Sequence, residues 1–335
     1  MTQSNLPRAR AIIVDAVKTP AHMGEVAVED RNLPDDELLI DVEYSSLNFK
    51  DAMALAGNPG IVRTTPLVPG IDAVGTVSAA PGGQFREGQA VLVNGAGLGE
   101  FRNGGYTQRV RVPAGQTIAL PGPLNARQAA AIGTAGFTAA LCVQALIDHG
   151  LTAEESDPVL VTGATGGVGS IAIHLLSQLG VNVAALTGRS DEYGDYLRGL
   201  GAAKVLDRAE FAEKGKPLQK ARFAGVIDTV GSHTLVNAIA QLKWGATAAA
   251  CGMAQGPDLP GTVLPFILRG VTLVGANSVD APLRMRERAW GIIARHLDLD
   301  VLEQMTQEVG LDEVIAAGEE LLAGKRHGRT VVRID

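Results

Sequence analysis

The sequence predicts an α/β protein in which a doubly wound parallel sheet follows a barrel-like all-β unit, and three observations support this prediction. A glycine-rich turn over residues 163–169 lies between an apolar run and an apolar-periodic stretch. Helical and strand-like patterns alternate over residues 126–279. Short apolar runs, separated by proline and glycine turns, fill residues 9–121. Parallel strands need crossover connections, so the alternation assigns the parallel sheet to the second region.

The glycine-rich turn predicts a dinucleotide site. Residues 158–186 have the pattern of a strand, a helix and a second strand, which makes one right-handed βαβ unit. The turn matches the dinucleotide fingerprint as Ala164-x-Gly166-x-x-Gly169, with alanine where the first glycine is usual. Glycines let the backbone approach a pyrophosphate, and the helix N-terminus offers N–H donors to that anion. The alternative is a glycine turn with a structural role alone.

The end of the second strand decides between NAD and NADP. NAD sites usually carry a carboxylate about 20 residues after the fingerprint, where it accepts from a ribose hydroxyl. Here the strand ends at Thr187-Gly188-Arg189, and Asp191 lies beyond it as a solvated turn residue. A guanidinium pairs with a 2′-phosphate, which a carboxylate would repel. The sequence therefore predicts NADPH, bound by Thr165, Gly166, Gly167, Val168, Gly169, Thr187, Gly188 and Arg189.

Composition indicates a globular protein and disfavours several partners. The chain has 335 residues, enough for two domains, and 46% of them are hydrophobic. A net charge of −7 argues against nucleic acid and anionic membranes as partners. We expect no membrane span, because no apolar run reaches about 18 residues, and residues 1–10 lack the apolar core of a signal peptide. Cys142 and Cys251 are interpreted as reduced thiols of a cytoplasmic protein.

The first region is expected to be mostly strand. Predicted strands cover residues 11–17, 38–45, 73–78, 90–93 and 106–112. Residues 48–56 are expected to form a helix after the second of these strands. Residues 95–105 form a glycine-rich loop with Glu100 and Arg102, which is either a mobile rim over a site or an ordinary surface loop.

The second region is expected to alternate helix and strand. A helix over residues 126–149 is interrupted at residues 133–136 by two glycines. Further strands are predicted over residues 204–206, 225–230, 246–251 and 271–275. Residues 263–268 are expected to be an edge strand, because Pro265 lies within them. Helices over residues 284–296 and 311–322 close the chain.

Several stretches together carry a resemblance to a known family: residues 45–51 (SSLNFKD), 68–72 (VPGID), 132–138 (IGTAGFT), 187–189 (TGR) and 265–269 (PFILR). With them the chain resembles the medium-chain dehydrogenase/reductase superfamily and its zinc-free quinone oxidoreductase branch. More narrowly, it is similar to the YhdH-like acrylyl-CoA reductases. The resemblance implies a GroES-like β-barrel catalytic domain over residues 1–125 and 280–335 and an NADPH-binding Rossmann domain over residues 126–279. It also implies a homodimer joined through strands 263–268 and 271–275.

The resemblance also bears on metals. Alcohol dehydrogenases of this superfamily bind a catalytic zinc through a cysteine and a His-Glu pair, where this chain carries Asn48 and Ile71-Asp72. Two cysteines cannot supply a Cys₄ structural site, and the six histidines are dispersed. We therefore expect no metal site, and no alcohol oxidation that would need a zinc Lewis acid.

The resemblance implies NADPH-dependent reduction of the C=C bond of an α,β-unsaturated acyl-CoA, most simply acrylyl-CoA. The catalytic candidates are Asn48, Phe49, Lys50 and Asp51. Asn48 is expected to donate to substrate or cofactor, and Phe49 to pack on the nicotinamide. Lys50 and Asp51 have an alternative role as an ion pair that anchors the helix. Phe49 has no proton to give, so we expect water or a ribose hydroxyl to deliver the proton.

The remaining site residues follow from strand ends and from the resemblance. Arg208 is expected near the 2′-phosphate, and Gly252, Met253, Asn277, Ser278 and Thr134 near the nicotinamide. The resemblance also implies that Ile267 contacts the cofactor, and the alternative is a core side chain. Arg63, Arg102 and Arg326 are candidates for acyl-CoA recognition, and the sequence does not select among them. Two alternatives stay open: a quinone or enone reductase of the same branch, and a non-catalytic NADPH-binding interaction protein.

Overall fold

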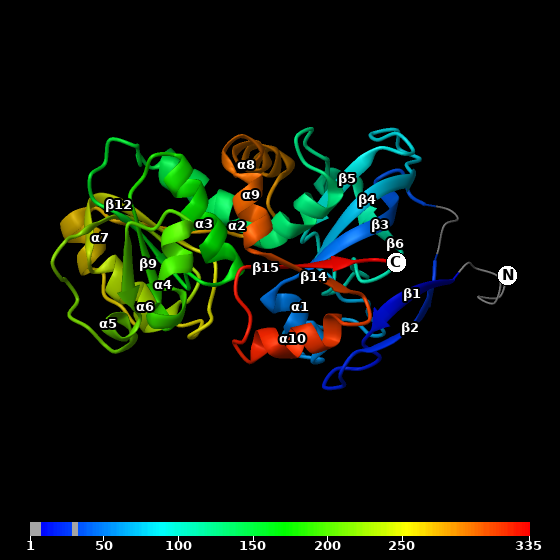
Figure 1. Cartoon of the computed structure of the whole chain (residues 1–335), viewed down its shortest axis with the longest axis horizontal. Coiled ribbons are helices and arrows are strands. Elements are labelled where there is room, and N and C mark those ends of the chain that lie inside the picture. Colours follow the sequence, from blue (N-terminus) through cyan, green and yellow to red (C-terminus); the bar gives the residue numbers. More distant parts are fainter. Residues whose placement is uncertain (1–7, 29–32) are drawn as a thin grey trace. The chain divides into compact units, whose positions relative to one another are not determined.

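Residues 8–28 and 33–335 are described by the structure, a computed structural model. The chain folds into two compact units, whose elements are labelled in Figure 1. Unit 1 comprises Met1–Thr134, Ser278–Ala294 and Leu302–Asp335, and unit 2 comprises Ala135–Asn277 and Arg295–Val301. The signal-peptide expectation rests mostly on residues 1–7, which lie outside the described residues.

Unit 2 is built on a six-stranded parallel sheet in the order β10-β9-β8-β11-β12-β13. The strands are β8 (Val159–Thr162), β9 (Val183–Thr187), β10 (Lys204–Asp207), β11 (Phe223–Asp228), β12 (Leu242–Ala250) and β13 (Thr272–Gly275). This is the order of a dinucleotide-binding fold, in which the strand order reverses between β8 and β11. Ligands of such sheets bind beyond the carboxyl ends of the strands at that reversal. The predicted fold class is confirmed.

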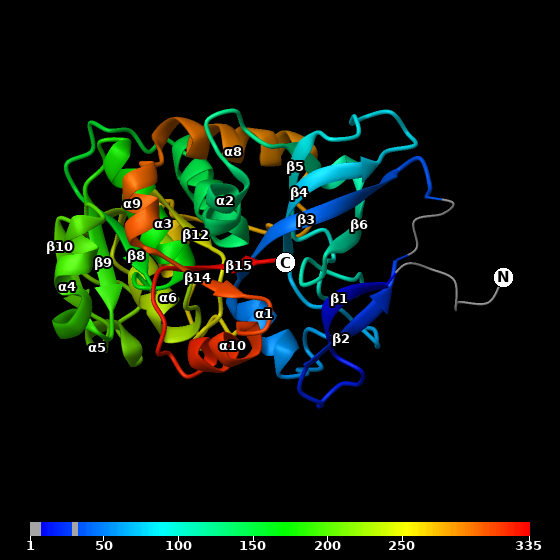
Figure 2. The same ribbon diagram turned by 45° about the vertical axis from the view of Figure 1, so that its right-hand side comes forward.

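Helices pack on this sheet between successive strands. They are α3 (Gly167–Gln178), α4 (Ser190–Gly199), α5 (Ala209–Ala212) and α6 (Ser232–Ile239). Helix α3 packs on β8 and β9, and α6 packs on β11 and β12. Figures 1 and 2 show these helices beside the strands. Strands β8 and β9 are buried at every residue, as expected for central parallel strands, and this explains their continuous apolar sequences.

The expected edge strand over residues 263–268 is wrong, because these residues belong mainly to helix α7 (Leu264–Arg269). Pro265 lies in its first turn, where the missing N–H removes no helical hydrogen bond. Gly270 ends the helix with a left-handed φ of 59°. Val263 and Ile267 are 65% and 68% exposed, so the apolar run covers a surface of unit 2.

Unit 1 contains a seven-stranded sheet in the order β14-β15-β3-β4-β5-β7, with β6 paired to β3, and a two-stranded sheet of β1 and β2. The strands are β1 (Arg8–Ile13), β2 (His22–Ala27), β3 (Glu37–Leu47), β4 (Asp72–Ala79), β5 (Ala90–Asn94), β6 (Arg109–Pro113), β7 (Thr117–Ala119), β14 (Thr306–Gly310) and β15 (Arg329–Arg333). The sequence did not indicate β2, β7, β14 or β15. Strand β15 pairs antiparallel with β3, far away in the sequence, so its partner cannot be inferred from local pattern.

Two helices from opposite ends of the chain pack together in unit 1. Helix α1 (Phe49–Leu55) follows β3, and α10 (Val314–Leu322) precedes β15. They lie side by side in Figures 1 and 2. The contact is close, because a Cβ on Gly318 would stand 2.8 Å from Cδ1 of Leu55. The C-terminal segment therefore supports the helix that carries the catalytic candidates.

Three further α-helices lie in the described part of the chain. Helix α8 (Leu283–His296) is followed by the short α9 (Leu299–Gln304). Helix α2 (Ala126–Asp148) is interrupted at Gly133, with φ 50° and ψ −159°, which confirms the expected interruption. By length and composition α2 could cross a membrane, but 89% of its most apolar window is buried inside the protein. It is therefore a core helix.

Candidate functional site

Asp72, the first residue of β4, is the centre of a buried polar network in unit 1. Its side chain accepts hydrogen bonds from Ser46 Oγ, Asn48 Nδ2 (2.9 Å), Thr134 N (2.9 Å), Thr134 Oγ1 (2.6 Å) and Asn94 Nδ2 (2.7 Å). A buried carboxylate needs such partners to offset its lost hydration. Asp72 therefore holds the end of β3, the end of β5 and the kink of α2 together.

Asn48 and Asp51 join this network from the start of α1. Oδ2 of Asp51 accepts from both the backbone N–H and the side-chain amide of Asn48, each at 2.9 Å. Oδ1 of Asp51 accepts from the backbone N–H of Ile71 at 2.7 Å. The amide of Asn48 therefore lies between two buried carboxylates, those of Asp51 and Asp72.

Burial dominates the electrostatics of this network. Burial, and then the negative charge of Asp72, raise the pKa of Asp51 to about 7. Burial also raises the pKa of Tyr106, whose hydroxyl donates to the carbonyl of Ser46 at 3.0 Å. Arg329 is the nearby cation: burial lowers its pKa, although both carboxylates favour its charge. Its Nε donates to the carbonyl of Ala131 at 2.6 Å.

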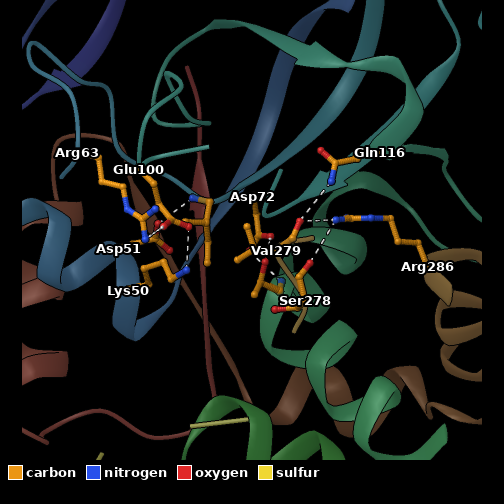
Figure 3. A network of polar contacts seen from close by, with 11 residues as sticks. Lys50, Asp51, Arg63, Asp72, Glu100, Gln116, Ser278, Val279 and Arg286 are labelled. Carbon is orange, nitrogen blue, oxygen red and sulfur yellow. Dashed lines mark hydrogen bonds and ion pairs between the residues drawn. The ribbon is translucent and has the colours of Figure 1, made fainter. Parts of the chain in front are cut away.

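Lys50 does not pair with Asp51, so the anchoring ion pair expected between them is wrong. Nζ of Lys50 lies 2.8 Å from Oε1 of Glu100, and the guanidinium of Arg63 lies 3.9 Å from Oε2. Figure 3 shows both cations beside Glu100. Asp51 is fully buried, whereas the side chain of Lys50 remains 29% exposed. The two cations share one buried carboxylate, which leaves an excess of positive charge beside α1.

The loop over residues 95–105 is well packed rather than an ordinary surface loop. The side chain of Glu100 is only 6% exposed. Leu98 within the loop and Tyr106 directly after it are fully buried.

Among the catalytic candidates at the start of α1, Phe49 is the most exposed. It is 51% exposed, so its ring can contact a ligand.

Ser278 lies in a segment of unit 1 that Arg286 holds from α8, as Figure 3 shows. The Arg286 guanidinium donates to the carbonyls of Ser278 (3.2 Å), Val279 (2.8 Å) and Asn94 (2.6 Å). Gln116 Nε2 also donates to the Val279 carbonyl, at 3.4 Å. Burial lowers the pKa of Arg286 to about 10. Asn94 connects this segment to Asp72, so the two polar clusters of unit 1 are continuous.

In unit 2, hydrogen bonds tie the carboxyl ends of β8 and β11 together. Thr162 Oγ1 donates to Asp228 at 2.7 Å, and Thr229 Oγ1 donates to the Thr162 carbonyl at 3.0 Å. Asp228 also accepts from the N–H of Gly231 at 2.7 Å. Burial raises the pKa of Asp228. These hydrogen bonds therefore join β8 and β11 at the point where the strand order reverses.

The glycine turn after β8 has the shape that a dinucleotide needs. Gly163 has a φ of 58°, and a Cβ there would stand 2.1 Å from Oγ1 of Thr229. A Cβ on Gly169 would stand 2.5 Å from the Gly163 carbonyl, so α3 begins directly against the turn. The first turn of α3 carries no acidic residue, and its free N–H groups suit an anion. These residues fit the pyrophosphate of a dinucleotide.

Two arginines flank Gly188 at the end of β9. Nη2 of Arg189 lies 2.7 Å from Oγ1 of Thr165, and the guanidinium lies 4.5 Å from the ring centroid of Tyr193. A Cβ on Gly188 would stand 3.0 Å from the guanidinium of Arg208. The structure thus brings Thr165, Thr187, Arg189 and Arg208 together, since the backbone N–H groups of both arginines also bond to Thr187.

The other predicted cofactor residues are less constrained. Met253 follows β12 and is 61% exposed, while Ile267 lies on α7 and is 68% exposed. Gly252 packs against Thr229, where a Cβ would stand 2.2 Å from its carbonyl. Thr134 donates both its N–H and its hydroxyl to Asp72, so in unit 1 it belongs to the buried network.

The three arginines considered for acyl-CoA recognition differ in how closely they pair with an acidic side chain. Arg102 pairs with Glu37 at 2.9 Å, and Arg326 pairs with Glu320 at 2.9 Å. Arg63 has the weaker contact with Glu100, at 3.9 Å, and is 61% exposed. Arg63 is therefore the most available of the three for an anionic ligand.

Sequence reasoning missed several members of the network. Asn94, Tyr106, Arg329 and Glu100 were not named as site residues. A signal existed for Arg329, because this charged residue stands two positions before the apolar pair Val331-Val332. Asn94 gave no signal, since an asparagine at the end of a strand is common in turns.

Comparisons with known proteins agree with this geometry. Residues 34–122 match the alcohol dehydrogenase GroES-like domain, and residues 167–295 match a family described as zinc-binding dehydrogenase. Among residues 8–28 and 33–335, however, no three His, Cys, Asp or Glu side chains gather where they could hold a metal ion.

Relatives match over nearly the whole chain. It is 45% identical over 330 residues to acrylyl-CoA reductase AcuI of Ruegeria pomeroyi, covering 97% of this chain and 99% of that protein. The crystal structure of the YhdH oxidoreductase of Salmonella enterica in complex with NADP is 42% identical, with a TM-score of 0.92, and covers 97% of this chain and 100% of that one. The structure of Bacillus subtilis YhfP with NAD bound is 38% identical, with a TM-score of 0.92, and covers 98% and 100%.

The fold, the glycine turn and these full-length similarities agree with one another. The chain belongs to the medium-chain dehydrogenase/reductase superfamily, in the branch that contains acrylyl-CoA reductase AcuI and YhdH.

Proposed function

We propose that this protein reduces the C=C bond of an α,β-unsaturated acyl-CoA with NADPH, converting acrylyl-CoA to propionyl-CoA. The observation that carries the proposal is the pair of arginines beside Gly188, with no carboxylate at the end of β9. It supports a 2′-phosphate and therefore NADPH. The assignment of acrylyl-CoA as the substrate is supported by the full-length similarity to acrylyl-CoA reductase AcuI.

The bound cofactor supplies hydride to the β-carbon of the thioester. Negative charge then develops on the thioester oxygen, and a preorganised donor is needed there. Lys50 is suited to this role, because Glu100 holds its ammonium at 2.8 Å while the side chain stays 29% exposed. We assign proton delivery at the α-carbon to water, because Phe49 carries no proton.

Recognition of CoA needs positive charge in a protein whose net charge is −7. Arg63 and Lys50 share the single carboxylate of Glu100, so this cluster keeps an excess positive charge. Of the three candidate arginines, we propose that Arg63 contacts the acyl-CoA, because Arg102 and Arg326 have closer acidic partners.

The division of labour follows the two units. Unit 1 is proposed as the catalytic domain, with Asn48, Phe49, Lys50 and Asp51, and unit 2 as the NADPH-binding domain. Within unit 2 the proposed contacts are Thr165, Gly166, Gly167, Val168, Gly169, Thr187, Gly188, Arg189, Arg208, Met253 and Ile267. Thr134 and Ser278 are the proposed contacts from unit 1.

We propose that the protein is a cytoplasmic homodimer. Strand β13 is an edge of the six-stranded sheet and can extend it into a second copy. Residues 263–268 cannot contribute a strand, because they lie mainly in helix α7. Sedimentation equilibrium tests this: a dimer supports it, and a monomer at micromolar concentration contradicts it.

A quinone reductase is the second candidate, favoured by the 40% identity to a protein named putative quinone oxidoreductase YhfP. Comparing kcat/KM for acrylyl-CoA and for 1,4-benzoquinone with NADPH separates the two. A higher value for acrylyl-CoA supports the proposed function. A higher value for the quinone, or no reduction of any enoyl-CoA, overturns it.

A further inference from the structure

The fold brings the two cysteines of the chain together. Cys142 and Cys251 are the only cysteines in the sequence, and they are far apart along it. Cys142 lies in helix α2, and Cys251 directly follows strand β12, both in unit 2. Their side chains nevertheless share a hydrogen bond. Both cysteines are free thiols, so no disulfide joins them in this structure.

The neighbouring strand holds Cys251 in this position. The backbone N–H of Cys251 donates to the carbonyl of Asp228 at 2.9 Å, and its Sγ donates to the same carbonyl at 3.3 Å. Asp228 is the last residue of β11, so the two bonds fasten the chain after β12 to that strand. The proton of Cys251 is directed at Asp228, and the hydrogen bond between the thiols is therefore donated by Cys142.

Helix α2 brings Cys142 to the same point. Leu146 lies one helical turn after Cys142 and packs on β11, because a Cβ on Gly225 would stand 3.4 Å from its Cδ1. One turn back along α2, and three residues along β11 from Gly225 to Asp228, lead to the thiol pair. The packing of a helix on a strand therefore sets the contact between the two thiols.

The two thiols differ in their access to solvent. Cys142 is fully buried, whereas Cys251 is partly exposed. The hydrogen bond to Cys251, and then burial, raise the pKa of Cys142 well above its usual value, so this thiol stays protonated. A small oxidant in solution therefore reaches Cys251 first, and Cys142 has Cys251 as its reaction partner.

We propose that Cys142 and Cys251 are a modification site, at which a peroxide converts the two thiols into an intramolecular disulfide. Sγ of Cys251 attacks one oxygen of hydrogen peroxide, the O–O bond breaks and water leaves, which gives a sulfenic acid. Sγ of Cys142 then attacks Sγ of Cys251, the S–O bond breaks, and a second water leaves with the proton of Cys142. Two thiols are oxidised, and one peroxide is reduced to two waters.

The disulfide changes the edge of unit 2 where the cofactor is proposed to bind. Sγ of Cys251 then carries no proton, so its hydrogen bond to the Asp228 carbonyl is lost. Gly252 and Met253 directly follow Cys251 and are predicted beside the nicotinamide, so this consequence rests on the proposed function. We expect the oxidised protein to bind NADPH about 3- to 10-fold more weakly, which corresponds to one lost hydrogen bond.

The test uses the full chain, reduced and then freed of reductant, with hydrogen peroxide as the oxidant. Free thiols are counted in denaturant, and unreduced peptides are mapped by mass spectrometry. We expect both thiols to disappear, a cross-linked pair of peptides that contains Cys142 and Cys251, and recovery of both thiols with dithiothreitol. Thiols that persist in peroxide, over-oxidation of Cys251 beside a free Cys142, or a disulfide between two copies of the chain overturn the proposal.

Cys142→Ala removes the second thiol and keeps a small apolar side chain at a buried position. In this variant, peroxide should leave a sulfenic acid on Cys251 that dimedone labels, whereas the wild type should be labelled only weakly. Equal labelling of the two proteins overturns the proposal, because Cys142 would then not react with the sulfenic acid. Thermal unfolding shows whether the variant folds, and the peptide map of the wild type decides the question if it does not.

The effect on the cofactor is measured separately. Dissociation constants for NADPH are determined by fluorescence on the reduced, the oxidised and the dithiothreitol-treated wild type. The constant should rise on oxidation and return with dithiothreitol, which does not reverse methionine oxidation. Equal constants for the reduced and oxidised protein overturn the coupling to the cofactor. The peptide map involves no cofactor, so a reduced protein that does not bind NADPH counts against the proposed function alone.

Discussion

Gly133 approaches Asp72 so closely that a Cβ at position 133 would stand 2.7 Å from Oδ2 of that carboxylate. The same Cβ would lie 2.5 Å from the Ser46 hydroxyl and 2.9 Å from the guanidinium of Arg329. The kink in α2 thus exists where the helix meets the buried network. It also turns the N–H of Thr134 toward Asp72.

Gly133→Ala is expected to destabilise the protein by about 2–4 kcal/mol, because a side chain there combines a left-handed φ with overpacking. Urea unfolding measures this change in the free energy of unfolding. Gly115→Ala is the matched control, since no atom lies within 4 Å of a Cβ at Gly115. Similar effects of the two substitutions would contradict the proposed tight packing at Gly133.

Asp51 should make the stability depend on pH. Its pKa is about 7 in the folded protein and 3.8 in its ordinary state, so the folded state binds more protons between these values. The contribution of Asp51 to the free energy of unfolding is therefore full below about pH 4 and is lost as the pH rises through about 7. Asp51→Asn should remove this contribution, so the variant gains stability relative to wild type between pH 5 and pH 8.

The control for this experiment is Asp258→Asn, which changes an exposed carboxylate of unit 2. Urea unfolding of the wild type, Asp51→Asn and Asp258→Asn is measured at pH 5 and at pH 8. The prediction is contradicted if the free energy of unfolding of Asp51→Asn differs from that of the wild type by the same amount at pH 5 and at pH 8. Asp51 would then be ionised in the folded protein throughout this range.

Arg189→Ala should weaken NADPH binding about 10- to 100-fold, because a charge-assisted hydrogen bond to the 2′-phosphate is lost. NADH lacks that phosphate, so its affinity should change little. Arg198→Ala serves as control, because Arg198 lies on α4, the helix that follows Arg189, and pairs with Asp195 at 2.8 Å. An equal loss for NADPH and NADH would mean that Arg189 does not recognise the phosphate.

Lys50→Met should lower kcat for acrylyl-CoA about 100-fold, which is typical for removal of one oxyanion donor. The dissociation constant for NADPH should stay the same. Lys243→Met is a matched control, since Lys243 is held by Asp157 at 2.7 Å in unit 2. Because Lys50→Met also leaves Glu100 with only the distant Arg63, melting temperatures accompany the kinetics. Unchanged kcat in a folded Lys50→Met variant would remove Lys50 from the mechanism.

Local pattern predicted the parallel sheet well, because each of its strands is a short apolar run followed by a turn and a helix. The turn at residues 163–169 and the arginine at position 189 lie next to each other only through that topology. Pattern failed over residues 263–268, where an apolar run with Pro265 is equally consistent with the first turn of a helix.

The buried network was predictable only in part. Asn48 and Asp51 are three residues apart at the start of one helix, so their contact is local. Asp72, Thr134 and Arg329 come from distant segments that only the fold brings together. The partner of Lys50 illustrates the same point: a neighbouring acid in the sequence was expected, and Glu100 from a packed loop is found.

Steady-state reduction of acrylyl-CoA by NADPH and by NADH, with propionyl-CoA measured as product, tests the central claim most directly. The arginines beside Gly188 predict one propionyl-CoA per NADPH oxidised and a kcat/KM at least about 10-fold higher with NADPH than with NADH. Equal or better turnover with NADH, or NADPH oxidation without propionyl-CoA, would contradict the account.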